Sequence, residues 1–504
     1  MAFAITQTCC SDASCVTVCP VNCIHPTPDE PDFGTTDMLY IDPHTCIDCG
    51  ACADACPVDA IFPLDQLSGQ LRDYAELNAA YYAEAEQAPA AAETGPNFHR
   101  WGAPVFDRSI PSDFGGLDVA VIGTGPAGMY AAEDLLLHTN STVTLIDRLP
   151  AAGGLVRFGV APDHLATKRI GETFARLHEH PRVRMRLGVE VGTDVTAEDL
   201  AREHDAVIYA VGASSARELG IPGEDLPGSL AATTAVAWYN GHPDVSPGAV
   251  DPSSERVVIV GNGNVALDVA RILTTDPDEL ADTPISPDAL ARLRTGKVRE
   301  VVLLGRRGPD AAAYTKPELR ALIQRDDVDL VVDAHHPRVS EAIESAVPGG
   351  KAALLREIPR EAVDLSAPPP DRRRIVLRFH SAPHEFLGDV QLRGLRVTGS
   401  TGDVDISAGQ VVRAIGYRAR PLPGLPFDEA TATIPNSGGR VDDLPGSYVV
   451  GWVKRGPSGG IGTNRECARE TIGTLLDDAI AGRLRTTGKR RKGLFPRLRV
   501  GARA

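Results

Sequence analysis

Nine of the ten cysteines of this 504-residue chain lie between Cys9 and Cys56. Such a density is typical of small secreted domains held by disulfides, or of domains that bind metal through thiolates. Residues 1–9 have no basic start, apolar block or small-residue cleavage site, so they do not resemble a signal peptide. No run of eighteen apolar residues occurs, which argues against a membrane span. We therefore expect a cytoplasmic protein whose cysteines bind metal.

The spacing of these cysteines indicates which metal group they bind. The main run is Cys46-x2-Cys49-x2-Cys52-x3-Cys56-Pro57, and a complementary half is Cys15-x3-Cys19-Pro20. In the first pattern three thiolates wrap one iron–sulfur cluster and the fourth crosses to a second cluster. A zinc ribbon is the alternative, but zinc favours two cysteine pairs separated by a long gap. The spacing predicts two iron–sulfur clusters.

Residues 1–65 resemble two-cluster ferredoxins, especially the seven-iron kind. The resemblance implies a 4Fe–4S cluster on Cys19, Cys46, Cys49 and Cys52, and a 3Fe–4S cluster on Cys9, Cys15 and Cys56. The loop between Cys9 and Cys15 is two residues shorter than in that family. Cys10 can therefore compete with Cys9, or add a fourth ligand and make the second site 4Fe–4S. Cys23 matches a non-ligand cysteine of the family, and Cys467 is expected to be a small buried residue.

From Leu117 onward the chain contains one element twice, an apolar strand followed by a glycine-rich turn and a helix. The turns are Gly123-x-Gly125-x-x-Gly128 and Gly261-x-Gly263-x-x-Ala266. Such glycines let a pyrophosphate approach the backbone at a helix N-terminus. We expect two Rossmann-like α/β folds after an α+β iron–sulfur domain. The second fold is expected to be inserted in the first, because a strand-like segment at 410–416 is followed by further glycine-rich chain.

The strand after each turn ends in a different charge. Asp147 ends the strand 143–147, and a carboxylate there suits free ribose hydroxyls, so the first fold is expected to bind FAD or NAD. Arg306 and Arg307 follow the strand 301–304 and suit the 2′-phosphate of NADPH. We expect the preceding helix to be extended through residues 275–297. A turn without a ligand and a solvated arginine pair are the alternatives.

From about Leu117 to Gly482 the chain resembles adrenodoxin reductase and the bacterial ferredoxin–NADP reductases related to it. The matching stretches are residues 154–164, 261–270, 305–309 and 451–457. The family has Glu where this chain has Asp147, and the shorter carboxylate should keep the ribose contact. With the cysteine-rich segment in front, the whole chain resembles the fused ferredoxin/ferredoxin–NADP reductases of mycobacteria.

This resemblance implies site residues. For FAD they are Ala127, Asp147, Leu155 and Val191, with Trp452, Gly459, Gly460 and Ile461 at the flavin. For NADPH they are Asn264, Val265, Arg306, Arg307, Glu318 and Gly459. His164 and Asp268 match polar residues near the reacting rings and are the catalytic candidates. A purely structural hydrogen-bonding role is the alternative for both.

The expected organisation has six parts. They are a ferredoxin domain at 1–73, a packing arm and linker at 74–116, the first part of the FAD domain at 117–213, the NADPH domain at 214–413, the second part of the FAD domain at 414–482, and a basic tail at 483–504. Residues 1–75 carry eleven acidic residues and only Arg72 as a base, while the tail carries nine Lys or Arg. The tail is expected either to bias docking of the acidic domain or to be solvated.

The implied activity is passage of electrons from NADPH through FAD to the clusters and on to an external one-electron acceptor, such as a ferredoxin or a cytochrome P450. No nucleic-acid partner is expected. One rival is the flavoprotein subunit of glutamate synthase, which also joins iron–sulfur cysteines to paired nucleotide folds. The other rival is a redox sensor or scaffold that binds these cofactors without turnover.

Overall fold

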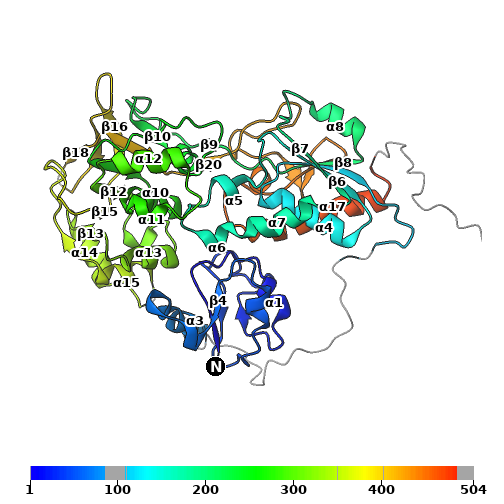
Figure 1. Ribbon diagram of the computed structural model, residues 1–504, viewed down its shortest axis with the longest axis horizontal. Coiled ribbons are helices and arrows are strands. Elements are labelled where there is room, and N and C mark those ends of the chain that lie inside the picture. Colours follow the sequence, from blue (N-terminus) through cyan, green and yellow to red (C-terminus); the bar gives the residue numbers. More distant parts are fainter. Residues whose placement is uncertain (1, 86–107, 109, 349, 401, 485–504) are drawn as a thin grey trace, which may run out of the picture.

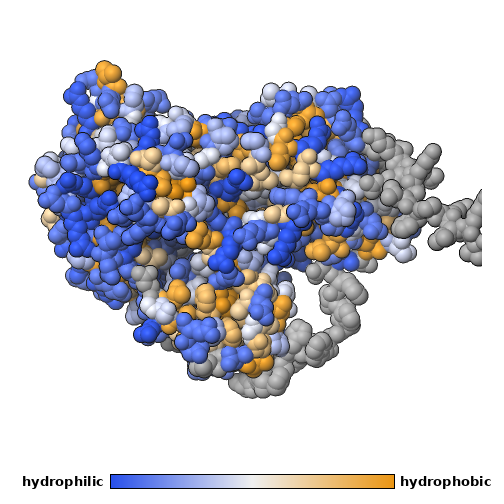
Figure 2. Space-filling model, in the orientation of Figure 1, coloured by the Kyte–Doolittle hydropathy of each residue, from blue (hydrophilic) through white to orange (hydrophobic). Residues whose placement is uncertain are grey.

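The computed structural model describes residues 2–85, 108, 110–348, 350–400 and 402–484, and it forms three bodies (Figure 1). A cysteine-rich module (residues 2–85) packs against two larger lobes. Most of the predicted linker and all but the first two residues of the predicted basic tail lie outside the described residues. Among the helices described, every one is too short or too polar to cross a lipid bilayer. The face drawn in Figure 2 is mainly hydrophilic over the outer part of the lobes, as expected for a surface in contact with water.

The cysteine-rich module is built from two similar halves. Its elements are β1 (Phe3–Ile5), α1 (Ser14–Val18), β2 (Ile24–His25), β3 (Tyr40–Ile41), α2 (Ala51–Ala55), β4 (Ile61–Pro63) and the 3-10 turns at 64–66 and 69–71. The strands pair antiparallel as β1 with β4 and β2 with β3. Cys19 ends α1 at φ −73° and ψ 114°, and Cys56 ends α2 at φ −73° and ψ 116°. The cysteines of the two Cys-Pro motifs therefore have the same backbone conformation.

Helix α3 (Asp73–Ala85) forms the first part of the predicted packing arm and lies on β1 and β3. Its buried Asn78 joins the two small sheets. The Asn78 side-chain oxygen accepts from the backbone N–H of Ile5 at 3.1 Å and of Ile41 at 2.8 Å, and its amide donates to the Ile5 carbonyl at 2.8 Å. Because buried backbone groups need partners, this one side chain holds β1 and β3 together.

The first lobe contains a seven-stranded sheet in the order β21-β22-β23-β8-β5-β6-β7. The strands are β5 (Asp118–Ile122), β6 (Thr142–Asp147), β7 (Val183–Leu187), β8 (Ala206–Tyr209), β21 (Asn436–Ser437), β22 (Arg440–Val441) and β23 (Ser447–Val449). The five from β23 to β7 are parallel. The helices are α4 (Pro126–His138), α5 (Gly154–Phe158), α6 (Leu165–Lys168), α7 (Ile170–His178), α8 (Ala197–Glu203), α16 (Trp452–Arg455) and α17 (Thr463–Ile480), and α4 packs on α17.

The second lobe contains a fully parallel seven-stranded sheet in the order β10-β19-β11-β12-β15-β13-β14. The strands are β10 (Ser229–Ala231), β11 (Arg256–Val260), β12 (Glu300–Leu304), β13 (Asp329–Asp333), β14 (Arg360–Glu361), β15 (Arg374–Arg378) and β19 (Gln410–Arg413). An antiparallel sheet of β16 (Pro383–Leu387), β17 (Gly394–Thr398) and β18 (Asp403–Ser407) adds to it. All these strands lie between β8 and β21 in sequence, so the chain leaves the first sheet, completes the second and returns.

The helices of the second lobe correct one expectation. They are α9 (Ala232–Tyr239), α10 (Asn264–Thr274), α11 (Pro277–Leu280), α12 (Pro287–Thr295), α13 (Lys316–Ile323), α14 (Pro337–Glu344) and α15 (Lys351–Leu354), with 3-10 turns at 309–311 and 355–357. The prediction that one helix extends through 275–297 was wrong. Helix α10 ends at Thr274, and Pro277 and Pro287 each start a new short helix, because proline cannot continue the hydrogen-bond ladder.

The two lobes are joined by a short two-stranded ladder of β9 (Ser215–Ala216) and β20 (Tyr417–Arg418), where the chain leaves and re-enters the first lobe. The module contacts both lobes. Arg320 of α13 pairs with Asp73 at 2.7 Å, and the Lys316 backbone N–H donates to Asp37 at 2.8 Å. On the other side Arg169, next to α6, pairs with Asp59. The module therefore packs against both lobes, as Figure 1 shows.

Candidate functional site: two nucleotide turns and two cysteine sites

The two glycine-rich turns have nearly the same geometry. Gly123 has φ +105°, and a Cβ there would lie 2.4 Å from the Ala210 carbonyl oxygen. Gly261 has φ +117°, and its Cβ would lie 2.3 Å from the Ala414 carbonyl oxygen. Only glycine satisfies both the left-handed backbone and the close approach. Each turn therefore presses against the neighbouring parallel strand and opens towards the helix that follows.

The second glycine of each turn precedes its helix in extended backbone. Gly125 has φ −72° and ψ 176° before α4, and Gly263 has φ −83° and ψ 177° before α10. Because both N-caps are glycines, neither has a side chain that could accept from the first N–H groups of its helix. The first backbone N–H groups of both helices thus point at an open turn, which is the donor set that a pyrophosphate requires.

The third position separates the two turns. A Cβ on Gly128 would lie 2.1 Å from the Gly123 carbonyl oxygen. The second turn has Ala266 there, and its side chain is fully buried in the core of the second lobe. The first helix therefore approaches its own turn more closely than the second helix does.

The strand ends carry the charges that the sequence predicts to select nucleotides. The Asp147 carboxylate accepts from the Thr124 N–H at 2.9 Å, from the Thr124 hydroxyl at 2.6 Å and from the Leu149 N–H at 3.0 Å. Arg306 and Arg307 follow β12 and are exposed, and neither guanidinium forms a hydrogen bond or ion pair with another described residue. Asp147 is thus part of its loop, whereas the two arginines are available to a ligand.

His164 and Asp268 lie together, as the resemblance implies, around a residue that the sequence analysis missed. Arg271 is buried and donates to Asp163 at 2.6 and 3.0 Å, to Asp268 at 2.8 Å and to the Nε2 atom of His164 at 2.8 Å. Because a guanidinium can only donate, Nε2 accepts, which leaves the proton of a neutral ring on Nδ1. Arg271 follows Asp268 by three residues on α10, and this helical spacing was the signal available in the sequence.

Glu318 of α13 completes this cluster, with a carboxylate oxygen 3.9 Å from His164 Nε2 and 3.7 Å from Arg271. Burial, reinforced by the nearby charge of Asp268, raises the pKa of Glu318 above its usual value. The three groups His164, Asp268 and Glu318 have ligand atoms close enough together to hold a metal ion. The Arg271 guanidinium already supplies the positive charge among them, so a second cation would be repelled.

Asn264 and Val265, two more predicted NADPH residues, begin α10 next to the second turn. The Asn264 side chain forms two hydrogen bonds with Thr315, the residue before α13. It accepts from the Thr315 N–H at 2.8 Å and donates to the Thr315 hydroxyl at 3.3 Å. This contact brings the N-terminal ends of α10 and α13 together. Glu318 and the second turn are thereby held on one side of the lobe.

The predicted flavin residues from the C-terminal part of the chain meet the start of α4. A Cβ on Gly451 would lie 2.5 Å from the Ala127 Cβ, so the chain passes Ala127 in close contact before Trp452. The Trp452 indole N–H donates to the Ser458 carbonyl at 3.0 Å. Cys467 is buried and accepts from the Gly451 N–H at 3.2 Å, which confirms that it is a small buried residue.

The segment Gly459–Ile461 precedes α17 and is held by the buried side chain of Asn464. The Asn464 amide donates to the carbonyls of Gly460 at 3.1 Å and Ile461 at 3.2 Å. Leu155 of α5 is exposed, while Val191 is buried in a core cluster with residues of the first sheet. The start of α4, which follows the first turn, and the C-terminal segment 451–461 therefore meet at one end of the first sheet.

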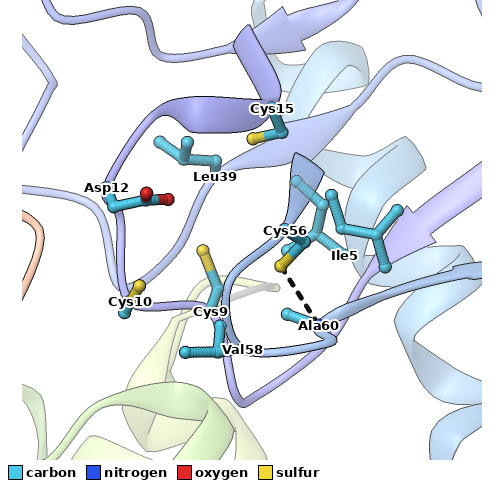
Figure 3. Close-up of a pocket in the computed structure, with 10 residues that line it drawn as sticks. Ile5, Cys9, Cys10, Asp12, Cys15, Leu39, Cys56, Val58 and Ala60 are labelled. Carbon is cyan, nitrogen blue, oxygen red and sulfur yellow. Dashed lines mark hydrogen bonds between the residues drawn. The ribbon is translucent and has the colours of Figure 1, made fainter. Parts of the chain in front are cut away.

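Four cysteines line a small cavity in the module (Figure 3). Its walls are formed by Ile5, Cys9, Cys10, Asp12, Cys15, Leu39, Cys56, Val58, Ala60 and Ile61. The sulfur atoms of Cys9, Cys15 and Cys56 point towards one another, and Cys10 lies to one side beside Asp12. The Ala60 N–H donates to the Cys56 sulfur at 3.2 Å. We call these residues the inner site, and three convergent sulfurs match the ligand set that the resemblance implies.

Burial raises the pKa of Cys9 to about 11 and that of Cys15 further. Buried thiols resist ionisation unless a positive charge is close, and iron is such a charge. The three convergent sulfurs in an otherwise largely apolar cavity fit an iron–sulfur cluster, whose iron would supply that charge. Burial and the charge of Asp12 also raise the pKa of Cys10, so the pKa does not distinguish Cys10 from Cys9 as a ligand.

The second set of cysteines, Cys19, Cys46, Cys49 and Cys52, forms what we call the outer site. Cys49 is exposed and Cys46 is partly exposed, while Cys19 and Cys52 are buried. The Cys23 sulfur lies 3.4 Å from the Cys19 sulfur. Hydrogen bonding from Cys23 lowers the pKa of Cys19 to about 5 and of Cys46 to about 6. Cys23 thus supports the thiolate form of its neighbours.

Comparison with known proteins places these features in one family. Residues 39–62 match a 4Fe-4S binding domain, and residues 117–335 match the pyridine nucleotide-disulphide oxidoreductase family. A probable ferredoxin/ferredoxin–NADP reductase of Mycobacterium tuberculosis is 48% identical over 498 residues, which covers 96% of this chain and 85% of that protein. The chain belongs to the ferredoxin/ferredoxin–NADP reductase family. The Mycobacterium leprae member is 46% identical over 493 residues, with coverage of 96% and 87%.

Solved structures extend this similarity to the fold of the two lobes. The structure of Mycobacterium tuberculosis FprA in complex with NADPH matches with a TM-score of 0.68 and 42% identity, covering 74% of this chain and 87% of that one. The FprA protein of that organism, an NADPH-ferredoxin reductase, is 46% identical over 382 residues. The family relation therefore covers both the cysteine-rich module and the paired lobes.

Proposed function

We propose that this chain is an NADPH-dependent ferredoxin reductase that uses FAD and passes electrons to iron–sulfur clusters in its own module. The observation that carries the proposal is the opposite charge at the strand ends that follow the two similar glycine-rich turns. Asp147 suits a nucleotide with free ribose hydroxyls, whereas Arg306 and Arg307 suit a 2′-phosphate. One chain thus has separate places for FAD and NADPH, with a cysteine module packed on both lobes.

The residues fit each group as follows. FAD would lie on the turn Gly123–Gly128, with Ala127, Asp147, Leu155, Val191 and Trp452 around it, and Gly459, Gly460 and Ile461 at the flavin. NADPH would lie on Gly261, Gly263 and Ala266, held by Asn264, Val265, Arg306, Arg307, Glu318 and Gly459. FAD, when bound, takes up electrons in pairs from NADPH and releases them singly, which the clusters require.

We assign positioning roles to the cluster around Arg271. The buried guanidinium fixes His164 and Asp268 at 2.8 Å each, so both side chains are held in place before a ligand arrives. Their catalytic assignment from the resemblance remains part of this proposal. A His164→Gln substitution keeps a hydrogen-bond acceptor for Arg271 but cannot transfer a proton, so hydride transfer at the parent rate in this variant would indicate a positioning role alone.

We propose the domain organisation expected from the sequence, with the NADPH domain at 214–413 inserted between FAD-domain parts at 117–213 and 414–482. The return of the chain to the first sheet at β21–β23 supports it. We also propose a cytoplasmic location, an external one-electron acceptor such as a ferredoxin or a cytochrome P450, and no nucleic-acid partner.

For the clusters we propose 4Fe–4S at the outer site and 3Fe–4S at the inner site. Protein purified without oxygen should contain one FAD and about seven irons, and its oxidised form should give the paramagnetic signal of a 3Fe–4S centre. Eight irons and a silent oxidised spectrum would instead mean that Cys10 is a fourth ligand. The Cys10→Ser variant decides between them, because it changes the iron content only in the second case.

The activity is tested by NADPH oxidation with ferricyanide and with cytochrome c. Turnover with NADPH and bound FAD supports the proposal. A chain that binds both nucleotides and does not oxidise NADPH would be the redox sensor or scaffold considered above, and the proposed function would then be wrong.

A further inference from the structure

The loop between Cys9 and Cys15 makes the contact between the inner site and the segment that we assign to the flavin. The Gly462 backbone N–H donates to the Cys10 carbonyl at 2.9 Å. A Cβ on Gly462 would lie 2.2 Å from the backbone of Ser11, and one on Gly460 would lie 3.8 Å from the Cys10 carbonyl oxygen. Backbone therefore meets backbone here, with no side chain between the two segments.

A charged contact holds the same loop from the side. Arg465, in the first turn of α17, donates to the Ser14 hydroxyl at 2.6 Å and lies 3.4 Å from the Asp12 carboxylate. Asp12 in turn accepts from the Ser14 hydroxyl at 2.5 Å. The Arg465 guanidinium also stacks over the ring of Tyr130 in α4, 5.8 Å from its centre. One arginine thus joins α4, α17 and the cysteine loop.

Asp12 has two roles in this arrangement. Its side chain is only 9% exposed and lines the inner cavity beside Cys10, Cys9 and Cys15. A buried carboxylate next to a redox group opposes the arrival of an electron, because like charges repel in a medium of low dielectric constant. Arg465 offsets that charge from outside the cavity. The pair can therefore set the local potential as well as the contact.

The outer site differs in its surroundings. Cys49 is exposed, and its neighbour Ile47 is 58% exposed. An exposed apolar side chain beside a ligand cysteine leaves this end of the module open to an external protein. The inner site, by contrast, lies beside the contact with segment 460–462 of the first lobe.

We propose that the Cys10–Ser14 loop is the internal entry port for electrons, that Arg465 and Asp12 keep it closed on the first lobe, and that electrons leave at the outer site. This inference rests on the proposed function. Each NADPH gives NADP+, one proton released to water and two electrons, so two one-electron transfers cross the port in each turnover. The order is inner site first, outer site second and external acceptor last.

The port is tested with Arg465→Gln and Asp12→Asn in the full-length protein. Stopped-flow reduction by NADPH, followed at flavin and cluster wavelengths, should show an unchanged flavin phase and a cluster phase slowed at least about tenfold in Arg465→Gln. Redox titration followed by paramagnetic resonance should show a lower midpoint potential of the inner site in Arg465→Gln and a higher one in Asp12→Asn. The opposite signs identify charge, because mere loosening would shift both variants alike.

Arg320→Gln is the matched control, since it also removes an arginine that pairs with the module, but at Asp73 and not at the cysteine loop. It should leave the cluster phase and the inner potential at parent values. Equal cluster rates in Arg465→Gln and parent protein would overturn the port. An equal slowing in Arg320→Gln would also overturn it, since any loosening of the module would then suffice. If NADPH does not reduce the parent flavin, the proposed function itself has failed.

The order is tested separately with Cys56→Ser and Cys49→Ser, each checked for FAD content and for the signal of the remaining cluster. Loss of the inner cluster should slow reduction of the outer one at least about tenfold. Loss of the outer cluster should leave reduction of the inner one at the parent rate. Parent-rate reduction of the outer cluster in Cys56→Ser would contradict the order. Should Cys56→Ser lose its FAD, Cys15→Ser provides the same test from the other side of the cavity.

Discussion

The two lobes repeat one turn but use their selecting charges differently. In the first lobe the Asp147 carboxylate takes three hydrogen bonds from its own loop. In the second lobe Arg306 and Arg307 are exposed, without a side-chain partner among the described residues. A selecting charge can therefore belong to the framework of the loop or be reserved for the ligand. Substitution of Asp147 should therefore lower the stability of the fold, whereas substitution of Arg306 and Arg307 should change only the selectivity for NADPH over NADH.

The largest expected effect comes from the third position of each turn. Gly128→Ala would place a Cβ 2.1 Å from the Gly123 carbonyl oxygen, against backbone that cannot move without distorting the turn. We expect FAD content to fall close to zero and the free energy of unfolding to drop by about 3 kcal/mol. Ala266→Gly, the reciprocal change, should cost only about 0.5–1 kcal/mol. Flavin absorbance per chain and thermal unfolding check both, and full FAD content in Gly128→Ala would contradict the difference between the turns.

The arginine pair gives the next effect. Replacing Arg306 and Arg307 with Ala removes two charge-assisted contacts to the 2′-phosphate, each worth about 1.5–3 kcal/mol. KM for NADPH should rise about 100-fold or more, since each 1.4 kcal/mol is about tenfold. KM for NADH and the melting temperature should stay near parent values. Steady-state kinetics with both nucleotides test this, and an equal loss with NADH would mean that the pair supports the fold.

Much of this arrangement could be predicted because it depends on local sequence. The ladder from Cys46 to Cys56 and the turns at Gly123 and Gly261 are short patterns in which each residue type has one physical reason. The same holds for the strand ends, since a charge after a buried strand lies at a fixed edge of a parallel sheet. The buried state of Cys467 followed from its residue type alone.

Contacts between distant segments could not be predicted from a single sequence. Asp12 and Arg465 are polar residues of ordinary appearance, and nothing in either neighbourhood indicates the other. For Arg271 the local signal was Asp268, three residues earlier on α10, but its contacts with Asp163 and His164 of the first lobe could not be predicted. The expectation of a long helix over 275–297 was wrong because Pro277 and Pro287 each start a new helix and do not continue the preceding one.

Asp147→Asn tests whether the Asp147 carboxylate both holds its loop and contributes to FAD binding. The amide has one oxygen for the Thr124 and Leu149 donors, and its NH2 group would face an N–H without an acceptor. We expect a loss of about 1.5–3 kcal/mol, shared between folding stability and FAD affinity. Asp147→Glu keeps the charge and is the control. Thermal unfolding and FAD titration of the deflavinated protein are the measurements, and an unchanged melting temperature would show that the loop does not depend on this charge.

The smallest effect concerns a lysine that joins the lobes. Lys168 of α6 donates to the Arg157 carbonyl at 3.0 Å and to Asn240 of the second lobe at 2.8 Å. Burial, together with the charge of Arg157, lowers the pKa of Lys168 to about 8 from 10.5. Between these values the unfolded chain holds a proton that the folded chain has lost, so stability contributed by this site rises with pH across that window. Below pH 8 the cost of the buried charge is fully present.

Lys168→Met removes this titration and serves as the reference. The melting temperature of the parent relative to Lys168→Met should increase between pH 7 and pH 10, by about 2 °C. The rise requires that the contact between the lobes breaks only when the lobes unfold. If the lobes separated earlier, Lys168 would be exposed to water in the separated lobe and would titrate at its ordinary pKa. A difference that stays constant over this range would therefore show that the lobes separate before either one melts, and that the two turns belong to independently unfolding units.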